Sequence, residues 1–212
     1  MRSKADNNKR ILPRGLYGIT GEKFSMGRSN IECVREMVRG GIEVIQYREK
    51  EKPLRDKIEE IKEIRELCRL NNVFFIVNDH IDTALLVGAD GVHVGQDDMH
   101  ISDVRTLVGN DMTIGLSTHS PQQAMQAVVD GADYIGVGPI FPTTTKDTPS
   151  VGLEYLEFAT ANINIPFVAI GGIKLHNIHE ITKRKPYSVC LVSEIVGAED
   201  IETTVRKVRD IL

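Results

Sequence analysis

Short apolar runs alternate with longer amphipathic segments along the whole chain. The apolar character of the short runs is nearly continuous, which is typical of parallel strands covered on both faces. Strands are therefore predicted, in chain order, at Leu16–Thr20, Val44–Arg48, Phe74–Asn78, Gly91–Gly95, Thr113–Ser117, Tyr134–Gly138, Phe167–Gly171 and Val189–Ser193.

The segments between these runs have helical spacing. Ser120 is predicted to cap a helix that begins at Pro121, and another helix is expected to end at Val108. Pro53 suits the first position of a further helix. One face of that helix would then carry the apolar residues Leu54, Ile58, Ile61, Ile64 and Cys68.

An internal near-repeat supports an alternation of strands and helices. The stretch GADGVHVG at 88–95 recurs as GADYIGVG at 131–138, with a looser relative, GIEVIQ, at 41–46. Successive copies lie 47 and 43 residues apart, which fits two strand–helix units between them. The pattern favours a single (β/α)8 TIM barrel at residues 14–212. A doubly wound open sheet is the alternative, but its glycine-rich nucleotide fingerprint is absent.

Composition narrows the setting and the partners. The 41% hydrophobic content of 212 residues is enough for a sizeable core, and the net charge of −4 gives no general attraction to nucleic acid or anionic membranes. The three cysteines lie in apolar segments without a disulfide pattern, which favours buried thiols and a cytoplasmic location. Residues 1–13 are expected to form a polar, flexible tail without a signal peptide. Small-molecule partners are expected, and a homo-oligomer is left open.

Candidate chemistry gathers where the second, third and fourth strands end, because barrel active sites lie at the carboxyl ends of strands. Gln46 and Arg48 share one face of the second strand, and Lys50 joins them if the chain stays extended. Asp79 and Asp98 follow the next two strands. Each could simply cap a helix, but together they describe a site for a hard cation such as Mg²⁺.

The later strands end in groups that suit an oxyanion. The sixth strand runs into GPIFPTTTK at 138–146, where two prolines stiffen a loop and Thr143, Thr145 and Lys146 supply hydroxyls and a positive charge. Gly171 and Gly172 end the seventh strand and would let backbone amides approach a ligand. The whole rim, with its basic residues and carboxylate pair, indicates a phosphate or pyrophosphate substrate bound through a divalent metal.

The motifs at these strand ends resemble those of the thiamine-phosphate synthase family, in the family's order from about Leu16 to the C-terminus. They read QYREK at 46–50, VND at 77–79, VHVGQDD at 92–98, GLSTH at 115–119, GVGPIFPTTTK at 136–146 and AIGGI at 169–173. The resemblance implies that 4-amino-2-methyl-5-hydroxymethylpyrimidine diphosphate and 4-methyl-5-(2-phosphoethyl)thiazole, or its carboxylated form, combine to thiamine phosphate and pyrophosphate. It also implies a dissociative reaction without a protein nucleophile.

The resemblance further implies residue roles. Mg²⁺ would lie on Asp79 and Asp98, and Arg48, Lys50 and Lys146 would neutralise the leaving pyrophosphate. The pyrimidine diphosphate would be held by Gln46, Arg48, Lys50, Asn78 and Lys146, with Ser117 near the pyrimidine. The thiazole phosphate would be held on the side of Thr143, Thr145, Gly172, Val192 and Ser193. Two departures from the family pattern are KRKPYS at 183–188 and Glu194 near the expected phosphate.

Two other functions compete with a synthase. A thiazole tautomerase of the same fold could use His119 as its acid–base group, because imidazole titrates near neutrality. The intact loop at 142–146 favours the synthase over the tautomerase. A non-catalytic barrel that binds a phosphorylated ligand would have no need for the pair Asp79 and Asp98.

Overall fold

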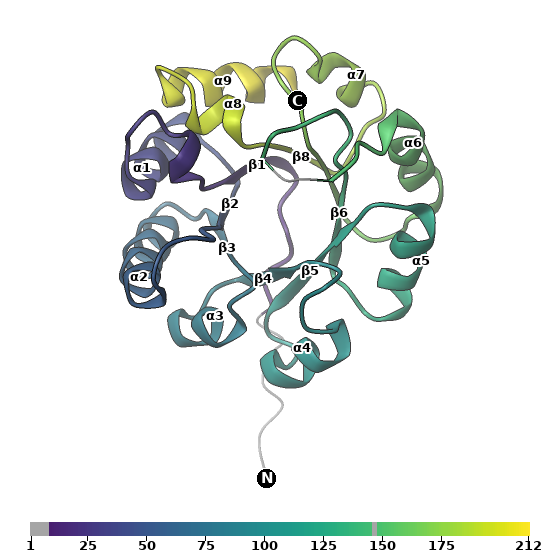
Figure 1. Ribbon diagram of the computed structural model, residues 1–212, viewed down its shortest axis with the longest axis horizontal. Helices are drawn as coiled ribbons and strands as arrows, with labels where there is room; N and C mark the ends of the chain where they lie inside the picture. Colours follow the sequence, from purple (N-terminus) through teal and green to yellow (C-terminus); the bar gives the residue numbers. More distant parts are fainter. Residues whose placement is uncertain (1–8, 146–147) are drawn as a thin grey trace.

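Eight parallel strands close into one barrel in chain order, β1 to β8, and the helices surround them (Figure 1). The computed structural model describes residues 9–145 and 148–212. The strands are β1 Gly15–Ile19, β2 Val44–Tyr47, β3 Phe74–Asn78, β4 Gly91–Val94, β5 Thr113–Thr118, β6 Tyr134–Val137, β7 Phe167–Ile170 and β8 Ser188–Leu191. Each overlaps the strand predicted from its apolar run, so the (β/α)8 prediction is confirmed.

The helices fill the segments between strands. Ser120 caps α5 as predicted, because its side chain accepts a hydrogen bond from the Gln123 amide. The helices are η1 Glu22–Phe24, α1 Asn30–Gly40, α2 Leu54–Leu70, α3 Ile81–Val87, α4 Ile101–Val108, α5 Pro121–Val129, α6 Gly152–Asn162, α7 Ile178–Thr182, α8 Ser193–Val196 and α9 Ile201–Ile211. No helix among the described residues is both long and apolar enough to span a membrane.

The core has two layers, because successive strand side chains point to opposite faces of the sheet. The outer layer lies between the strands and the helices and includes Cys33 and Cys68, whose burial raises the thiol pKa to about 11 and about 12. All three cysteines are unpaired and buried, as expected. The inner layer lies inside the barrel and consists of Leu12, Tyr17, Ile19, Val44, Phe74, Ile76, Tyr134, Val168 and Cys190.

The near-repeat has a structural explanation in its acidic residue. Asp90 directly precedes the first residue of β4, Asp133 directly precedes the first residue of β6, and Glu43 has the same place before β2. Each carboxylate binds a basic side chain: Arg65 for Asp90, Arg105 for Asp133 and Arg209 for Glu43. Each also accepts a hydrogen bond from a backbone amide of the preceding strand: Phe75 for Asp90, Ile114 for Asp133 and Leu16 for Glu43.

Residues 9–14, here called the N-terminal arm, cross the ring of strands before β1 (Figure 1). Leu12 is 2% exposed and belongs to the inner core layer. Arg10 forms an ion pair of 3.0 Å with Asp90 and lies over the Phe74 ring, 5.4 Å from its centroid. The described part of the expected tail, residues 9–13, therefore packs against the amino ends of the strands, which we call the closed end.

Two further contacts fasten the arm and involve the atypical segment at 183–188. The Tyr187 hydroxyl donates to the Leu12 carbonyl at 2.9 Å, and the Ser188 hydroxyl donates to the Pro13 carbonyl at 3.2 Å. Lys9 pairs with Asp133. The segment that departs from the repeat thus carries hydroxyl donors to the arm where other copies carry an acid.

Candidate active site

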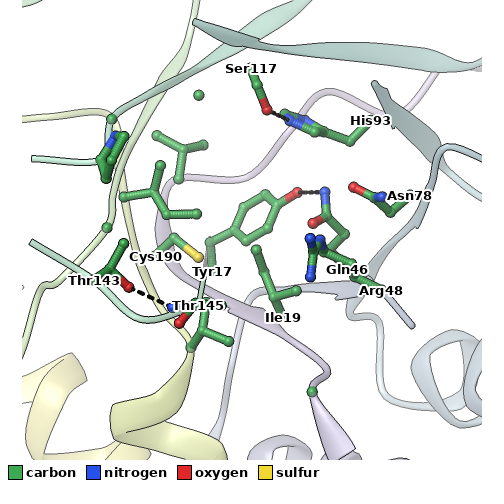
Figure 2. A pocket seen from close by; sticks show the side chains of 18 of the residues that line it. Tyr17, Ile19, Gln46, Arg48, Asn78, His93, Ser117, Thr143, Thr145 and Cys190 are labelled. Carbon is green, nitrogen blue, oxygen red and sulfur yellow. Dashed lines mark hydrogen bonds between the residues drawn. The ribbon is translucent and has the colours of Figure 1, made fainter. Parts of the chain in front are cut away.

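A cavity opens at the carboxyl ends of the strands, which we call the mouth. Its wall includes every predicted site residue that lies in the described part of the chain. These are Gln46, Arg48, Lys50, Asn78, Asp79, Asp98, Ser117, Thr143, Thr145, Gly172, Val192 and Ser193. Lys146, the remaining predicted site residue, lies outside the described residues. Figure 2 shows the cavity, with side chains from both sides of the barrel directed toward it.

The side formed by β2 carries the basic groups. Gln46 is buried, whereas Arg48 is half-buried and Lys50 exposed. The Arg48 amide donates to the Thr20 hydroxyl at 2.8 Å, but within the described residues the Arg48 guanidinium has no hydrogen bond or ion pair. Lys50 pairs with Asp79, at 2.7 Å between Nζ and Oδ2. A cation without a partner at a cavity wall is available to an anionic ligand.

A partly buried polar cluster supports the loop between β2 and α2, on which Arg48 and Lys50 lie. Glu60 of α2 accepts a hydrogen bond from the Tyr47 hydroxyl at 2.6 Å, and Lys52 bridges Glu60 and Glu22. Burial alone would raise the pKa of Glu60, but hydrogen bonds from Lys52, Tyr47 and Asn30 outweigh it and lower that pKa. The carboxylate is therefore the form that this cluster stabilises.

The two predicted metal ligands line the same cavity. Asp79 has a φ of 62°, a left-handed conformation uncommon outside glycine, and its amide donates to the His93 carbonyl at 2.9 Å. Asp98 accepts a hydrogen bond from the Gly95 amide at 2.7 Å. Each carboxylate keeps further acceptor positions. Within residues 9–145 and 148–212 no cluster of three or more His, Cys, Asp or Glu could hold a metal. A pair of carboxylates with substrate phosphates is the arrangement that Mg²⁺ favours, so the residues present fit this ion.

The loop after β6 is seated on the glycine pair that ends β7. Phe141 donates its amide to the Gly171 carbonyl at 3.0 Å, and Gly171 and Gly172 have φ values of 97° and 64°. A Cβ on Gly172 would lie 2.5 Å from the Pro142 carbonyl oxygen, and one on Gly171 would lie 2.3 Å from Pro139 Cβ. From the sequence, Gly171 and Gly172 were predicted to let a ligand approach the backbone. In the structure the absence of their side chains also lets the loop after β6 pack against the end of β7.

The threonines of this loop differ in direction. Thr143 and Thr145 line the cavity, and the Thr143 hydroxyl accepts a hydrogen bond from the Thr145 amide at 3.2 Å (Figure 2). Thr144 is exposed and does not belong to the wall. Glu194, whose position raised a question at the sequence level, accepts from the Leu175 amide at 3.1 Å and is also not part of the wall.

Three aromatic residues inside the barrel were not predicted as site residues. Tyr17, His93 and Tyr134 line the floor of the cavity and connect Gln46 to Ser117. Gln46 Nε2 donates to the Tyr17 hydroxyl at 3.0 Å, and the Tyr17 and Tyr134 hydroxyls lie 3.0 Å apart. His93 Nδ1 lies 2.9 Å from the Tyr134 hydroxyl, and His93 Nε2 lies 2.9 Å from Ser117 Oγ. Figure 2 draws the first and last of these bonds.

A signal for these residues was present in the sequence. His93 stands between Val92 and Val94, at the alternate position that faces the barrel interior. A polar side chain such as imidazole that points from a buried strand into the barrel interior needs a hydrogen-bonding partner there. His119 also lines the cavity, and its Nδ1 bonds to the Gly138 carbonyl, which holds the ring beside the loop after β6.

Known proteins resemble this chain over nearly its whole length. The family model described as "Thiamine monophosphate synthase" matches residues 16–195. The thiamine-phosphate synthase of Pelotomaculum thermopropionicum is 60% identical over 204 residues, which cover 95% of this chain and 94% of that protein. The thiamine-phosphate synthase of Caldicellulosiruptor saccharolyticus is 49% identical over 212 residues, with 99% and 96% covered.

A solved structure agrees with these matches. The structure of thiamine phosphate pyrophosphorylase from Pyrococcus furiosus superposes with a TM-score of 0.87 at 38% identity. The superposition covers 97% of this chain and 96% of that one. The similarity therefore includes the barrel and the loops that form its mouth.

Proposed function

This chain belongs to the thiamine monophosphate synthase family and is a transferase, and from this premise we propose how its cavity performs the synthase reaction. The substrates are 4-amino-2-methyl-5-hydroxymethylpyrimidine diphosphate and 4-methyl-5-(2-phosphoethyl)thiazole, or its carboxylated form. The bond between the pyrimidine methylene carbon and the diphosphate oxygen breaks, and the thiazole nitrogen forms a new bond to that carbon. The products are thiamine phosphate and pyrophosphate, and the carboxylated thiazole also releases its carboxyl group as carbon dioxide.

The observation that carries this proposal is the Arg48 guanidinium, which has no partner among the described residues at a wall shared with Lys50, Asp79 and Asp98. In a dissociative substitution, negative charge grows on the leaving pyrophosphate. Fixed donors aimed at that charge stabilise the transition state more than the ground state. Arg48 and Lys50 are the described residues that supply this charge, and the family resemblance adds Lys146.

Asp79 and Asp98 would hold Mg²⁺ in this arrangement. The ion would supply positive charge to the diphosphate oxygens and so assist departure of pyrophosphate. Lys50 already pairs with Asp79, which keeps an ammonium group next to the proposed ion and the diphosphate. Asn78 and Gln46 contribute neutral donors and acceptors to the pyrimidine side of the cavity.

The loop after β6 and the start of α8 would bind the second substrate. Thr143 and Thr145 line the cavity, and Gly172, Val192 and Ser193 line it as well, with Gly172 directly beneath the loop after β6. Alignment of two reactants in one cavity lowers the barrier without a protein nucleophile. We place the reaction in the cytoplasm because the three thiols are unpaired and buried.

The test is to incubate the purified protein with both substrates and Mg²⁺, with and without a chelator. Thiamine phosphate and pyrophosphate are expected in equal amounts, and only with the metal present. Absence of product together with isomerisation of the carboxylated thiazole phosphate would contradict the proposal and assign the tautomerase function to His119.

A substitution of Asp98 tests the proposed metal site independently of the other site residues. Asp98→Ala is expected to abolish metal-dependent turnover and to leave the thermal midpoint unchanged. Asp97→Ala is the matched control, because Asp97 is exposed and does not belong to the cavity wall. Full activity of Asp98→Ala would show that the metal lies elsewhere.

A further inference from the structure

The buried row of hydrogen bonds from Gln46 to Ser117 has a use beyond packing, and its use rests on the proposed function. Gln46 and Ser117 line the cavity and are the groups that the family resemblance assigns to the pyrimidine side. Tyr17, Tyr134 and His93 link them through contacts of 3.0, 3.0, 2.9 and 2.9 Å. We call these five side chains the relay.

The barrel makes room for this row at one position. The strand register places Gly115 of β5 between His93 of β4 and Tyr134 of β6. A Cβ on Gly115 would lie 2.1 Å from Tyr134 Cζ and 2.5 Å from His93 Nδ1. Real Cβ atoms do not approach other atoms this closely, so only glycine lets the Tyr134 and His93 side chains meet across β5.

Each tyrosine brings a single proton to the relay. Burial raises the pKa of Tyr17 and of Tyr134 above the usual value for a phenol, so both remain neutral. A neutral hydroxyl that accepts one hydrogen bond must donate its own proton onward. Because Gln46 Nε2 donates to Tyr17, Tyr17 donates to Tyr134, and Tyr134 donates to His93 Nδ1.

The direction of these bonds sets the chemistry at both ends. His93 with an acceptor Nδ1 carries its proton on Nε2 and donates it to Ser117 Oγ. The Ser117 proton is then directed to the cavity, so Ser117 is a donor there. At the other end Gln46 uses its NH₂ group on Tyr17 and keeps Oε1 as an acceptor. Turning the Gln46 amide over would reverse every bond and exchange the two roles.

Arg48 favours the first direction. It lies two residues beyond Gln46 on the same face of the extended chain, and both line the cavity. A fixed guanidinium charge near the amide attracts the amide oxygen and repels its NH₂ group. Gln46 therefore keeps its NH₂ group toward Tyr17 and its oxygen toward the cavity.

We propose that Tyr17, Tyr134 and His93 are positioning residues that fix Gln46 as an acceptor and Ser117 as a donor, and so select an aminopyrimidine over its oxo counterpart. The edge of a 4-aminopyrimidine offers an amino donor next to a ring-nitrogen acceptor. The 4-oxo analogue offers the reverse, an oxygen acceptor next to an N–H donor. A relay of fixed direction matches the first pattern and opposes the second at both ends.

The first experiment measures Kd for the aminopyrimidine diphosphate and for its 4-oxo analogue by titration calorimetry. Mg²⁺ is present and the thiazole phosphate is left out, so no coupling occurs. The wild-type protein is expected to prefer the amino compound, and Tyr134→Phe is expected to reduce that preference about 10-fold, the effect of about one hydrogen bond. An unchanged preference in Tyr134→Phe would overturn the proposal.

Tyr155→Phe is the matched control. The Tyr155 hydroxyl is buried and donates to Thr118 Oγ1 at 2.6 Å, but Tyr155 is not in the cavity wall. Its loss removes one buried tyrosine hydrogen bond and should leave the preference of the wild type. If both variants lost the preference equally, the effect would be one of stability and the proposal would fail.

The second experiment reads the relay without any ligand. The ¹⁵N shifts of the His93 ring are expected to show the Nε2–H tautomer in the wild-type protein. Tyr17→Phe and Tyr134→Phe each interrupt the row of hydrogen bonds between Gln46 and His93, so each should populate both tautomers and lose selectivity. An Nδ1–H tautomer in the wild type would overturn the proposed direction. A wild type that binds neither diphosphate would instead overturn the proposed function, and the tautomer measurement would still decide the relay.

Discussion

At the closed end of the barrel, Asp90 lies between Arg10 and Arg65, and Asp133 lies between Lys9 and Arg105. At the mouth, the Arg48 guanidinium has no partner within the described residues. Both ends are rich in charge, but Asp90 and Asp133 at the closed end are each paired with two cations of the protein, whereas Arg48 at the mouth is left for a ligand.

The difference separates stability from activity. Paired charges at the closed end hold strands, helices and the N-terminal arm together. An unpaired cation at the mouth adds little to folding and is ready for a charged substrate. Substitutions at the two ends should therefore have opposite effects, and the following variants test this from the largest expected effect to the smallest.

Asp90→Asn should lower the free energy of unfolding by about 3–5 kcal/mol, because its carboxylate is 5% exposed and serves two arginines as well as the Phe75 amide. Asparagine keeps the size and one acceptor but leaves Arg65 without its counter-charge. Urea denaturation measures the change, and kcat/KM should stay within about two-fold of wild type. Asp111→Asn, at an exposed position, is the control. Equal urea midpoints for the two variants would contradict the role of the closed end.

Arg48→Ala should lower kcat/KM by about 10²–10³-fold, the effect of removing one donor to a developing negative charge. Its free energy of unfolding should remain within about 0.5 kcal/mol of wild type, because the guanidinium has no partner to lose among the described residues. Steady-state kinetics with both substrates measures the first quantity.

Arg10→Ala makes the same substitution at the closed end and serves as the control for Arg48→Ala, with the opposite result expected. It removes the ion pair with Asp90 and the contact with Phe74, so stability should fall while kcat/KM is retained. If Arg10→Ala lost activity as strongly as Arg48→Ala, the two ends would not be independent.

Leu12→Ala should lower the free energy of unfolding by about 2–3 kcal/mol, because Leu12 is 2% exposed and fills the inner core at the closed end. Its neighbour Ile11 is 78% exposed, so Ile11→Ala should change stability by less than about 0.5 kcal/mol. Thermal or urea unfolding of the pair measures the difference. Equal values would mean that the arm does not contribute to the core.

Glu60→Gln should lower the free energy of unfolding by about 1–2 kcal/mol at pH 7, because its carboxylate accepts bonds from Lys52 and Tyr47. Burial raises the pKa of Glu60, but these hydrogen bonds lower that pKa by a larger amount. The pKa of Glu60 in the folded protein therefore lies below its value in the unfolded chain. The stabilisation is thus complete above the unfolded pKa, about 4.3, and disappears as the pH falls through the folded pKa.

The pH dependence gives the measurement for this cluster. Urea midpoints of wild type and Glu60→Gln should differ at pH 7 and converge in acid below about pH 4. Glu59→Gln, on the exposed side of α2, should differ from wild type at neither pH. A constant difference across this range would contradict the ionised state of Glu60.

Much of the fold followed from local pattern. Parallel strands buried on both faces need continuous apolar runs, and these runs gave every strand. The helical pattern was less reliable at the ends of helices. Leu54 was placed on the apolar face of α2 but is 43% exposed, whereas Lys57 is buried and its ammonium contacts the Lys50 carbonyl and His80. The spacing of apolar residues predicts which face of a helix is buried. It does not predict at which residue the end of the helix extends beyond the sheet and that face becomes exposed.

The candidate site was predictable where a strand ends in a polar residue, as at Arg48 and Asp79. The relay was not, because Tyr17 and Tyr134 are 117 residues apart and meet only when the barrel closes. The second role of Gly171 and Gly172, as the seat of the loop after β6, also depends on a neighbour that the local sequence does not reveal. The role of Lys146 stays a prediction.

The N-terminal arm joins parts of the chain that are far apart in sequence. Its partners Asp90 and Asp133 stand 80 and 124 residues further along, and the hydroxyl donors Tyr187 and Ser188 stand 175 residues further along. Contacts of such long range cost loop-closure entropy before they stabilise anything. The arm is therefore expected to become fully ordered late in folding, when β8 has joined β1 and the barrel has closed.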